Sequence, residues 1–281
     1  TTCRTINALA HHCLAAEHFT PAKLRAPLDE DAIEGALTRA RLAADAWEVA
    51  AIWACIMEFL RSSDAEIGPQ HVASSGAGAP DTARTIALAQ AVWRAMSDAA
   101  CETPLSFDGT VKLWSLRAPS LGYEIIMVDE AQDTSRPALS VLRAQRAQVI
   151  YAGDPHQQIY EWRGAVDALN AAQVEDERHL TQTFRFGANI AHVANTVLSA
   201  LGEPRRISPN PAVEDNVGPC AAPDIILARS NAGVFRCAAE LLERGGIPHI
   251  VGRAAHFQHL IESVAALQAG KPAFHPDLTG F

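Results

Sequence analysis

The stretch EIIMVDEAQD, at residues 124–133, decides the fold of this chain. Its apolar residues, Ile125 to Val128, predict a short buried strand that ends directly at two acids. A helical segment at 139–146 follows, and after it a second apolar run that ends in an acid, QVIYAGD at 148–154. Because parallel strands are joined by crossover helices, this alternation predicts a parallel sheet and an α/β fold.

The two acids after the first strand match the Walker B arrangement of nucleotide-binding proteins. In open α/β sheets, ligands bind at the carboxyl ends of the strands. We therefore expect Asp129 to hold Mg²⁺ through water, and Glu130 to orient and deprotonate the water that attacks a γ-phosphate. A strand that runs into an acidic helix N-cap would give the same pattern, and these residues alone leave both interpretations open.

Two later motifs favour the nucleotide interpretation. They are YAGDPHQQIYEWRGA at 151–165 and LTQTFRFGANI at 180–190. With them, the chain resembles the UvrD/Rep-like superfamily 1 DNA helicases: DEAQD looks like motif II, GDPHQQIYEWRGA like motif III and QTFRFGANI like motif IV. The resemblance implies a RecA-like P-loop NTPase core with an incomplete parallel sheet, a large helical insertion and the start of a second RecA-like domain.

Three further segments are similar to the F-box DNA helicase branch of this family and its bacterial relatives. They are FLRSSDAEIGPQHV at 59–72, PLSFDGTVKLWSL at 104–116 and ILARSNAGVF at 226–235. Together with the motifs, they extend the resemblance across most of the chain.

The resemblance assigns nucleotide-site roles to three more residues, with ATP and Mg²⁺ as cofactors. Gln157 would sense the γ-phosphate, and Arg185 would act as an arginine finger that offsets transition-state charge. Phe184, where the family usually has tyrosine, would stack on adenine. The alternative is that Phe184 and Arg185 only cap the helix that follows them.

The resemblance also implies contacts with single-stranded DNA. Tyr160 and Trp162 would offer aromatic faces to bases, and Arg163 would reach a phosphate. Stacking of a base on an aromatic ring is worth roughly 1–3 kcal/mol whatever the base. The alternative for Trp162 is a buried core tryptophan, although its charged neighbours argue against deep burial.

The segment CRTINALAHH at 3–12 resembles motif Ib, in which a threonine and a histidine two residues later contact DNA. Thr5 matches this pattern, whereas Asn7 departs from it and keeps only the capacity to hydrogen-bond a phosphate. Lys112 is a further candidate for a phosphate contact, with a solvated surface lysine as the alternative.

The pattern along the chain predicts four parts. They are a first core at 1–19 and 106–200, a helical insertion at 20–105, a linker at 201–222 and a truncated second core at 223–281. Residues 27–60 carry the strongest helical periodicity, and either Asp29 or Asp31 is suited to cap that helix. In the second core, DIILARS at 224–230 and IPHIVG at 247–252 predict strands on either side of a helix.

Composition narrows the class of protein without identifying a function. The chain of 281 residues has a net charge of −9, so no overall basic field indicates nucleic acid, although a groove needs only local charge and stacking surfaces. The six cysteines are scattered and the eleven histidines lack companion ligands, so we expect reduced thiols and no zinc site. No apolar run approaches the roughly 20 residues of a membrane span, and a bacterial source would imply a cytoplasmic, nucleoid-associated protein.

The phosphate-binding pattern G-x-x-x-x-G-K-[ST] is absent from these residues. The pair Gly270-Lys271 fails, since Ala265 and Pro272 stand where the pattern needs glycine and a hydroxyl. The resemblance places this loop before residue 1 and motifs V and VI after Phe281, so we expect an inactive fragment of an ATP-dependent helicase that acts on single-stranded DNA and duplex junctions. The alternatives are a catalytically dead DNA-binding or scaffold protein, and a P-loop enzyme unrelated to DNA.

Overall fold

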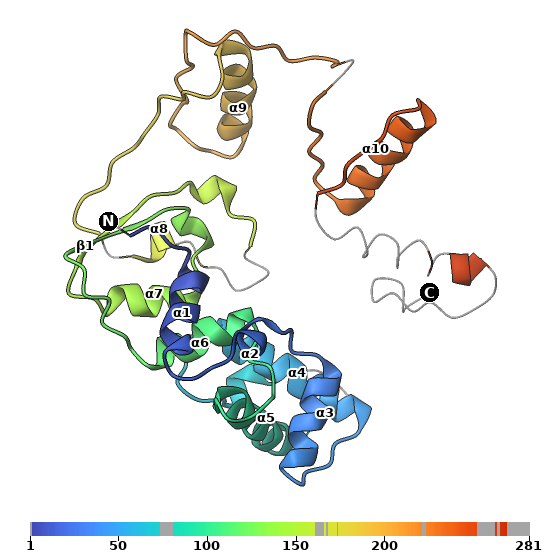
Figure 1. The fold of residues 1–281 in the computed structure, drawn as a ribbon. Helices are drawn as coiled ribbons and strands as arrows, with labels where there is room; N and C mark the ends of the chain where they lie inside the picture. The colour runs from blue at the N-terminus through green and yellow to red at the C-terminus, as the bar shows by residue number, and fades with distance from the viewer. Residues whose placement is uncertain are drawn as a thin grey trace. The chain divides into compact units, whose positions relative to one another are not determined.

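The computed structural model of the chain describes residues 2–73, 81–160, 166, 168–172, 174–220, 223–251, 262 and 265–268. The chain divides into two compact units, Thr1–Glu177 and Arg178–Phe281. Figure 1 labels strand β1 and helices α1 to α8, which belong to the first unit together with β2, and α9 and α10, which belong to the second. Among the described residues, all buried hydrophobic side chains lie in the first unit except Ala191 and Ala238.

A parallel pair of strands forms the centre of the α/β part. Strand β1 (Ile125–Val128) pairs with β2 (Gln148–Tyr151) in a register that places Val128 beside Tyr151. The crossover contains the short 3₁₀ helix η2 (Ala131–Asp133) and helix α7 (Arg136–Arg143). The predicted α/β architecture with a parallel sheet is therefore confirmed.

Burial of β1 is less complete than its sequence predicts. Val128 is buried in a cluster with Leu139 and Leu142 of α7 and with Ala168 of α8 (Ala168–Ala171). In contrast, Met127 is 76% exposed and Ile125 is also exposed. A continuous apolar run is typical of a strand covered on both faces, whereas here the cluster around α7 covers one face. The prediction of a fully buried strand was wrong.

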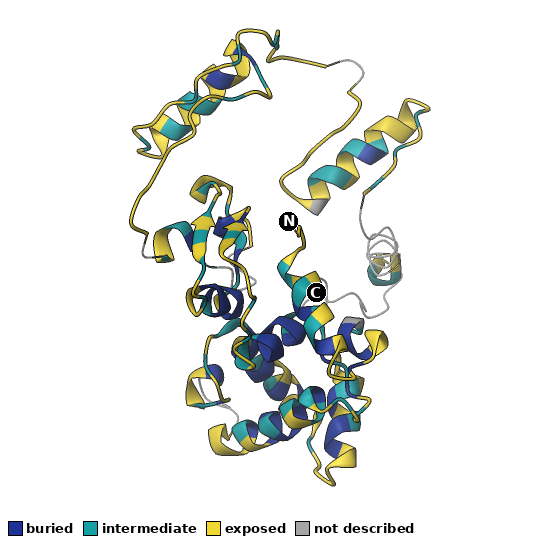
Figure 2. Cartoon of the chain, turned by 60° about the vertical axis from the view of Figure 1, so that its left-hand side comes forward, coloured by how far each residue is buried: buried dark blue, intermediate teal, exposed yellow. Residues whose placement is uncertain are grey.

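Helices pack around a second, larger core. They are α2 (Pro21–Arg25), α3 (Glu30–Arg39), α4 (Ala46–Arg61), the 3₁₀ helix η1 (Pro69–His71) and α5 (Thr82–Ser97). Their buried faces meet in one cluster that includes Ile33, Ile52, Phe59 and Met96 (Figure 2). The described residues between 20 and 105 are helical or irregular and contain no strand, as the helical periodicity predicted.

The predicted single helix over 27–60 is in fact two helices. Helix α3 ends at Arg39, and Arg41 has a left-handed backbone with φ 57°. Asp45 then starts α4 with a capping box, because its carboxylate accepts from the backbone N–H of Glu48 while the Glu48 side chain accepts from the N–H of Asp45. The capping box at Asp45 therefore starts a new helix within a segment whose apolar spacing predicted one continuous helix.

Two helices link the helical core to the sheet. Helix α1 (Ile6–Ala15) and helix α6 (Phe107–Leu116) pack together with α7. Their small shared core includes Ala10, Val111, Trp114 and Val141.

The second unit contains fewer regular elements than predicted. Helices α9 (Ala188–Ala200) and α10 (Asn231–Glu243) form where the sequence indicates helices. The described residues of the two expected strands, 224–230 and 247–251, have no strand pairing, so these strand predictions were wrong. Leu227 and Ile247 are 92% and 94% exposed. A strand requires hydrogen-bonding neighbours, and the described part of this unit provides none for these segments.

Membrane insertion finds no support in the described helices, none of which is long and apolar enough to span a bilayer. The same part of the chain holds no group of three histidine, cysteine or acidic residues arranged for a metal ion.

Candidate nucleotide and DNA site

Two acids occupy the carboxyl end of β1, as the sequence predicted. Asp129 and Glu130 follow Val128 directly and are both exposed. Glu130 has a left-handed backbone with φ 50°, and its N–H donates to Asp129 Oδ1 at 3.0 Å. Such backbone strain costs on the order of 1–3 kcal/mol and is concentrated at functional sites. Exposed carboxylate oxygens with room for water are the ligands that Mg²⁺ prefers, so these residues fit the ion.

The acidic end of β1 is joined to the segment after β2 by side-chain hydrogen bonds. Gln132 is 2% exposed; its Nε2 donates to Glu130 Oε2 at 2.7 Å, and its Oε1 accepts from the Asp154 N–H at 3.1 Å. Asp154 in turn caps the 3₁₀ helix η3 (Pro155–Gln157), and Asp154 Oδ2 accepts from Gln157 Nε2 at 2.7 Å. The structure therefore brings Glu130 and Gln157 to one end of the sheet.

Phe184 and Arg185 belong to the second unit, and their expected approach to Glu130 stays a prediction. Phe184 is 81% exposed, which leaves its ring accessible for stacking. Neither residue caps α9. That helix starts after Gly187, and Asp215 accepts hydrogen bonds from its first N–H groups, including Ile190 N at 3.0 Å. Despite the opposing effect of burial, these hydrogen bonds hold the pKa of the Asp215 carboxyl below its ordinary value. The alternative of a capping role is therefore wrong.

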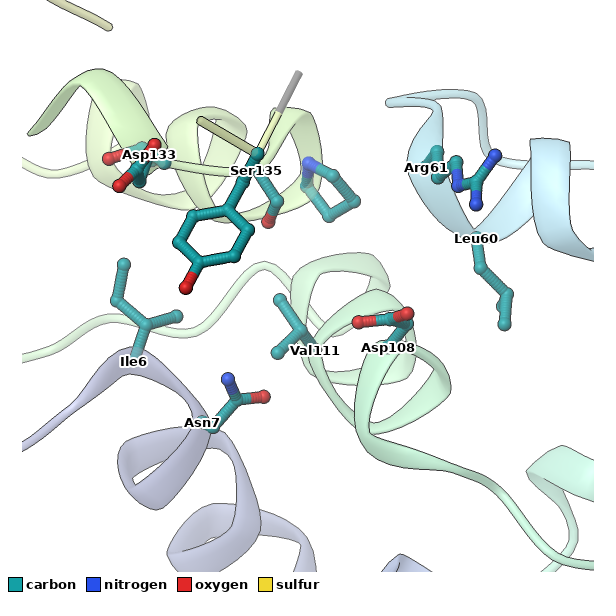
Figure 3. A pocket seen from close by; sticks show the side chains of 11 residues that line it. Ile6, Asn7, Leu60, Arg61, Asp108, Val111, Asp133 and Ser135 are labelled. Carbon is teal, nitrogen blue, oxygen red and sulfur yellow. The ribbon is translucent and has the colours of Figure 1, made fainter. Parts of the chain in front are cut away.

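A pocket in the first unit brings together two of the predicted DNA-contacting residues, Asn7 and Tyr160. Its volume is about 270 Å³. The lining comes from the start of α1, the end of α4, the start of α6, the crossover and the segment after η3 (Figure 3). The remaining lining residues are Ile6, Leu60, Arg61, Asp108, Val111, Asp133, Thr134, Ser135 and Pro137.

Two lining residues have polar atoms that the described structure leaves without a hydrogen-bond partner. Arg61 Nε and Asp133 Oδ1 are both buried and unpaired, although the other end of the Arg61 guanidinium forms an ion pair with Glu58 at 3.0 Å. One atom is a donor and the other an acceptor, so a ligand with both kinds of group would satisfy them. Neither residue was predicted from the sequence as part of a site, although Asp133 is the last residue of the DEAQD motif.

Thr5 has a structural role beside this pocket. Its Oγ1 accepts from the Ala8 N–H at 3.1 Å and caps α1. The hydroxyl keeps its proton, so Thr5 can still donate to a phosphate. Trp162 and Arg163 lie outside the described residues, and their roles stay predictions.

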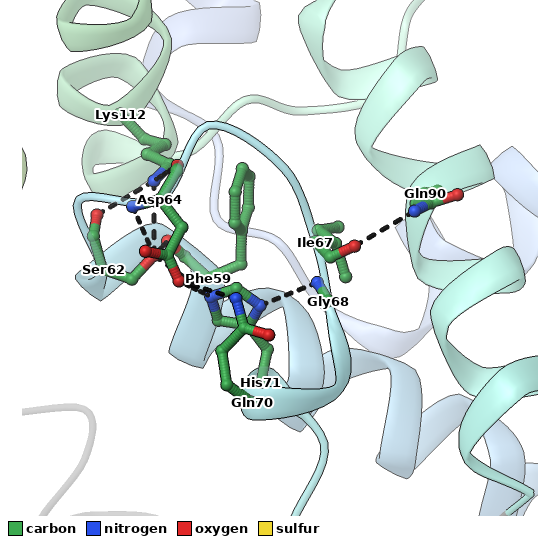
Figure 4. Close-up of polar contacts among 9 residues, drawn as sticks. All are labelled: Phe59, Ser62, Asp64, Ile67, Gly68, Gln70, His71, Gln90 and Lys112. Carbon is green, nitrogen blue, oxygen red and sulfur yellow. Dashed lines mark hydrogen bonds and ion pairs between the residues drawn. The ribbon is translucent and has the colours of Figure 1, made fainter.

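Lys112 does not fit the predicted phosphate contact, and it is not a solvated surface lysine either. Its side chain is 0% exposed, and Nζ donates to Ser62 O at 2.9 Å and to Asp64 O at 2.5 Å (Figure 4). The ammonium also lies 4.0 Å from the centre of the Phe59 ring. Burial lowers the pKa of Lys112 to about 8, although Asp64 opposes this shift. Lys112 is buried because it faces the end of α4, and the loop after α4 wraps around it.

Comparison with known proteins supports the resemblance that the motifs of the first unit indicated. Residues 112–177 match the UvrD/REP helicase N-terminal domain. This match covers motif II and motif III, and it confirms the resemblance that the motifs indicated: the chain is UvrD-like.

Individual relatives extend the similarity. The chain is 36% identical to F-box DNA helicase 1 of Gallus gallus over 217 residues, which are 71% of the chain and 21% of that relative. It is 30% identical to F-box DNA helicase protein 1 of Schizosaccharomyces pombe over 52% of the chain and 18% of the relative. It is also 34% identical to a probable DNA helicase II homolog of Mycoplasma pneumoniae over 31% of the chain and 13% of the relative. The chain therefore spans about a fifth or less of the length of these relatives.

Proposed function

We propose that this chain is part of an ATP-dependent DNA helicase that moves along single-stranded DNA. One observation carries the proposal: the motif Asp129–Asp133 contributes to two sites at once. Glu130 joins the hydrogen bonds that lead to Gln157, while Asp133, three residues later, lines the pocket with Asn7 and Tyr160. A short rigid segment with contacts on both sides is what coupling of hydrolysis to DNA binding requires.

The nucleotide half of the proposal rests on the end of the sheet. ATP with Mg²⁺, when bound, supplies the γ-phosphate and the charge that the site must stabilise. Asp129 would hold the ion through water, Glu130 would accept a proton from the attacking water, and Gln157 would donate to a phosphate oxygen. From the second unit, Arg185 would offset negative charge in the transition state, and Phe184 would stack on adenine.

The DNA half rests on the pocket. Tyr160 offers an aromatic face, and Asn7, Arg61 and Asp133 surround it with donors and acceptors. Trp162 and Arg163 would extend this surface along the strand. Because a base can stack on Tyr160 only when it is not stacked inside a duplex, the proposed substrate is single-stranded DNA, including strands beside duplex junctions.

A DNA-binding protein without hydrolysis is the second candidate. It is favoured by one observation: the pocket that contains Asn7 and Tyr160 offers an aromatic ring and polar groups to a strand without any nucleotide. Both candidates share the DNA site, so DNA binding is the first property to test.

The test is fluorescence anisotropy of a labelled oligo-dT strand titrated with residues 1–281. Tyr160→Ala should weaken binding by about 5- to 150-fold, which corresponds to the loss of one stacked base worth roughly 1–3 kcal/mol. Tyr123→Ala is the matched control, because Tyr123 is an exposed tyrosine that does not line the pocket. Equal affinities for wild type and Tyr160→Ala would sink the proposed DNA site.

A further inference from the structure

Gln132 connects the two segments that form the candidate nucleotide site. It is one of the most deeply buried polar side chains of the first unit, yet both groups that it joins belong to segments at the exposed end of the sheet. Its Nε2 reaches Glu130 after β1, and its Oε1 reaches Asp154 after β2. The proposed roles of Glu130 and Gln157 give Gln132 no part, so its burial and its two hydrogen bonds need an explanation.

The orientation of the Gln132 amide is fixed by chemistry. The backbone N–H of Asp154 can only donate, so it must meet the oxygen of the amide. The nitrogen end then necessarily faces Glu130, where it donates to the carboxylate at 2.7 Å. A glutamate at position 132 would instead place a carboxylate against Glu130, so the site requires an amide.

The backbone around Gln132 leaves the amide little freedom. A Cβ atom at position 153 would overlap Gln132 Oε1 and would lie 2.9 Å from the backbone nitrogen of Ala131. Gly153 therefore permits the close approach of the two segments. Ala131 N also donates to Ala152 O at 2.9 Å, which extends the hydrogen bonding between the two segments up to Ala131, the neighbour of Gln132.

Asp154 continues the connection to Gln157. Asp154 Oδ1 accepts from the His156 N–H at 3.0 Å and Oδ2 accepts from Gln157 Nε2 at 2.7 Å, so its carboxylate is held by two donors. The Gln157 amide has two N–H bonds. One is directed to Asp154, and this contact orients the amide so that the second can donate to a phosphate oxygen.

We propose that Gln132 is a positioning residue that couples Glu130 to Gln157, so that a displacement of Gln157 by nucleotide is transmitted to the carboxylate of Glu130. The role of this coupling in hydrolysis rests on the proposed function, but the coupling itself is a property of the chain without ligands. Three hydrogen bonds carry it: Gln132 to Glu130, Asp154 to Gln132 and Gln157 to Asp154.

The experiment records the side-chain amide signals of Gln157 by ¹H–¹⁵N NMR in residues 1–281 without ATP or DNA. Gln132→Met keeps the length of the side chain and removes both of its hydrogen bonds, so the Gln157 signals should shift. Gln145→Met is the matched control. Gln145 also bridges segments, since its Nε2 donates to Pro119 O at 2.9 Å and its Oε1 accepts from Leu121 N at 2.9 Å. The control should leave Gln157 unchanged.

Gln157 signals that stay in place in Gln132→Met, or that move equally in Gln145→Met, would overturn the coupling. If circular dichroism shows that Gln132→Met is unfolded, Gln157→Met replaces it, because Gln157 is exposed. This variant removes the hydrogen bond from Gln157 to Asp154 and leaves those of Gln132 in place, so the side-chain amide signals of Gln132 should shift if the two residues are coupled. Unchanged Gln132 signals would overturn the proposal.

The two proposals fail separately. A negative NMR result leaves the effect of Tyr160→Ala on DNA affinity untouched, and a negative anisotropy result leaves the coupling of Gln132 to Gln157 intact. If Gln132→Met shifts the Gln157 signals while Tyr160→Ala leaves DNA affinity unchanged, the coupled site serves a function other than DNA translocation.

Discussion

Lys112 shows how one buried cation can organise a loop. Its ammonium binds the carbonyl oxygens of Ser62 and Asp64, and the Asp64 carboxylate in turn lies 3.0 Å from His71 Nε2. His71 Nδ1 accepts from the Gly68 N–H at 3.0 Å, so in the neutral ring Nε2 carries the proton and donates. The segment 59–72, whose sequence resembles the F-box DNA helicase branch, is thus held around Lys112 of α6 by these contacts.

Lys112→Met should destabilise the protein without weakening DNA binding. The apolar stem remains, but two partly buried carbonyl groups lose a charged donor, at a cost of about 2–4 kcal/mol at pH 7. Because burial lowers the pKa of Lys112 to about 8 from the ordinary 10.5, the unfolded chain holds this proton more tightly than the folded chain. Between these values, raising the pH therefore stabilises the wild type relative to the variant. In urea unfolding at pH 7, 8 and 9.5, the difference between the free energies of unfolding of the wild type and Lys112→Met should increase with pH.

If this difference in free energy of unfolding decreases as the pH rises, Lys112 is not a buried lysine with a lowered pKa. A loss of oligonucleotide affinity in Lys112→Met, measured on folded protein, would restore the phosphate contact that the sequence suggested.

Gly153→Ala tests the close approach of the segments after β1 and β2. The added Cβ would overlap the Gln132 amide oxygen and crowd a backbone nitrogen, so the chain must shift there. Overpacking of this kind typically costs about 1–3 kcal/mol. Gly218→Ala is the control, because a Cβ at position 218 meets no atom within 4 Å. Thermal unfolding followed by circular dichroism should show a lower midpoint for Gly153→Ala alone, and equal midpoints would contradict the packing.

Features that depend on residues close together in the sequence could be predicted. Features that depend on contacts between residues far apart in the chain could not. The βαβ unit was predicted because its apolar runs and its crossover lie within thirty residues or so of each other. The burial of Lys112 was missed because its partners lie 48 to 50 residues earlier in the chain. The role of Gln132 was missed for a similar reason, since a glutamine inside a motif gives no indication of which segment it faces.

The residues that start helices are the other local signal. For α3, the sequence offered two candidate N-cap residues, and the structure distinguishes between them. Asp29 Oδ1 accepts from the Ala32 N–H at 2.9 Å, which makes Asp29 the N-cap, whereas Asp31 lies within the first turn. Asp29→Ala should therefore destabilise by about 0.5–2 kcal/mol. Asp31→Ala should cost less, because only its favourable interaction with the helix dipole is lost. The two free energies of unfolding, from urea titrations, should differ in this order; the reverse order would place the cap at Asp31.

At the scale of the whole molecule, the two units differ in how far their apolar residues are covered. Among its described residues, the first unit contains three core clusters, built on the helices α3 to α5, on α1 with α6 and α7, and on the sheet with α7. In the described part of the second unit, the only buried hydrophobic side chains are those of Ala191 and Ala238, and the segments that the sequence predicts as strands leave their large apolar side chains exposed. An apolar pattern in a sequence indicates that a segment can form a strand. The strand forms only where another segment of the fold provides hydrogen-bonding partners.

This contrast predicts that the two units behave differently as separate polypeptides. Residues 1–177 bury three clusters of apolar side chains and should unfold cooperatively in urea, with a midpoint close to that of residues 1–281. Residues 178–281 alone should give no sharp transition and should bind a hydrophobic dye such as ANS, because Leu180, Leu227 and Ile247 are each more than 90% exposed. A sharp transition for residues 178–281, together with weak dye binding, would show that these side chains find partners within that unit. The helices α9 and α10 would then be parts of a complete core.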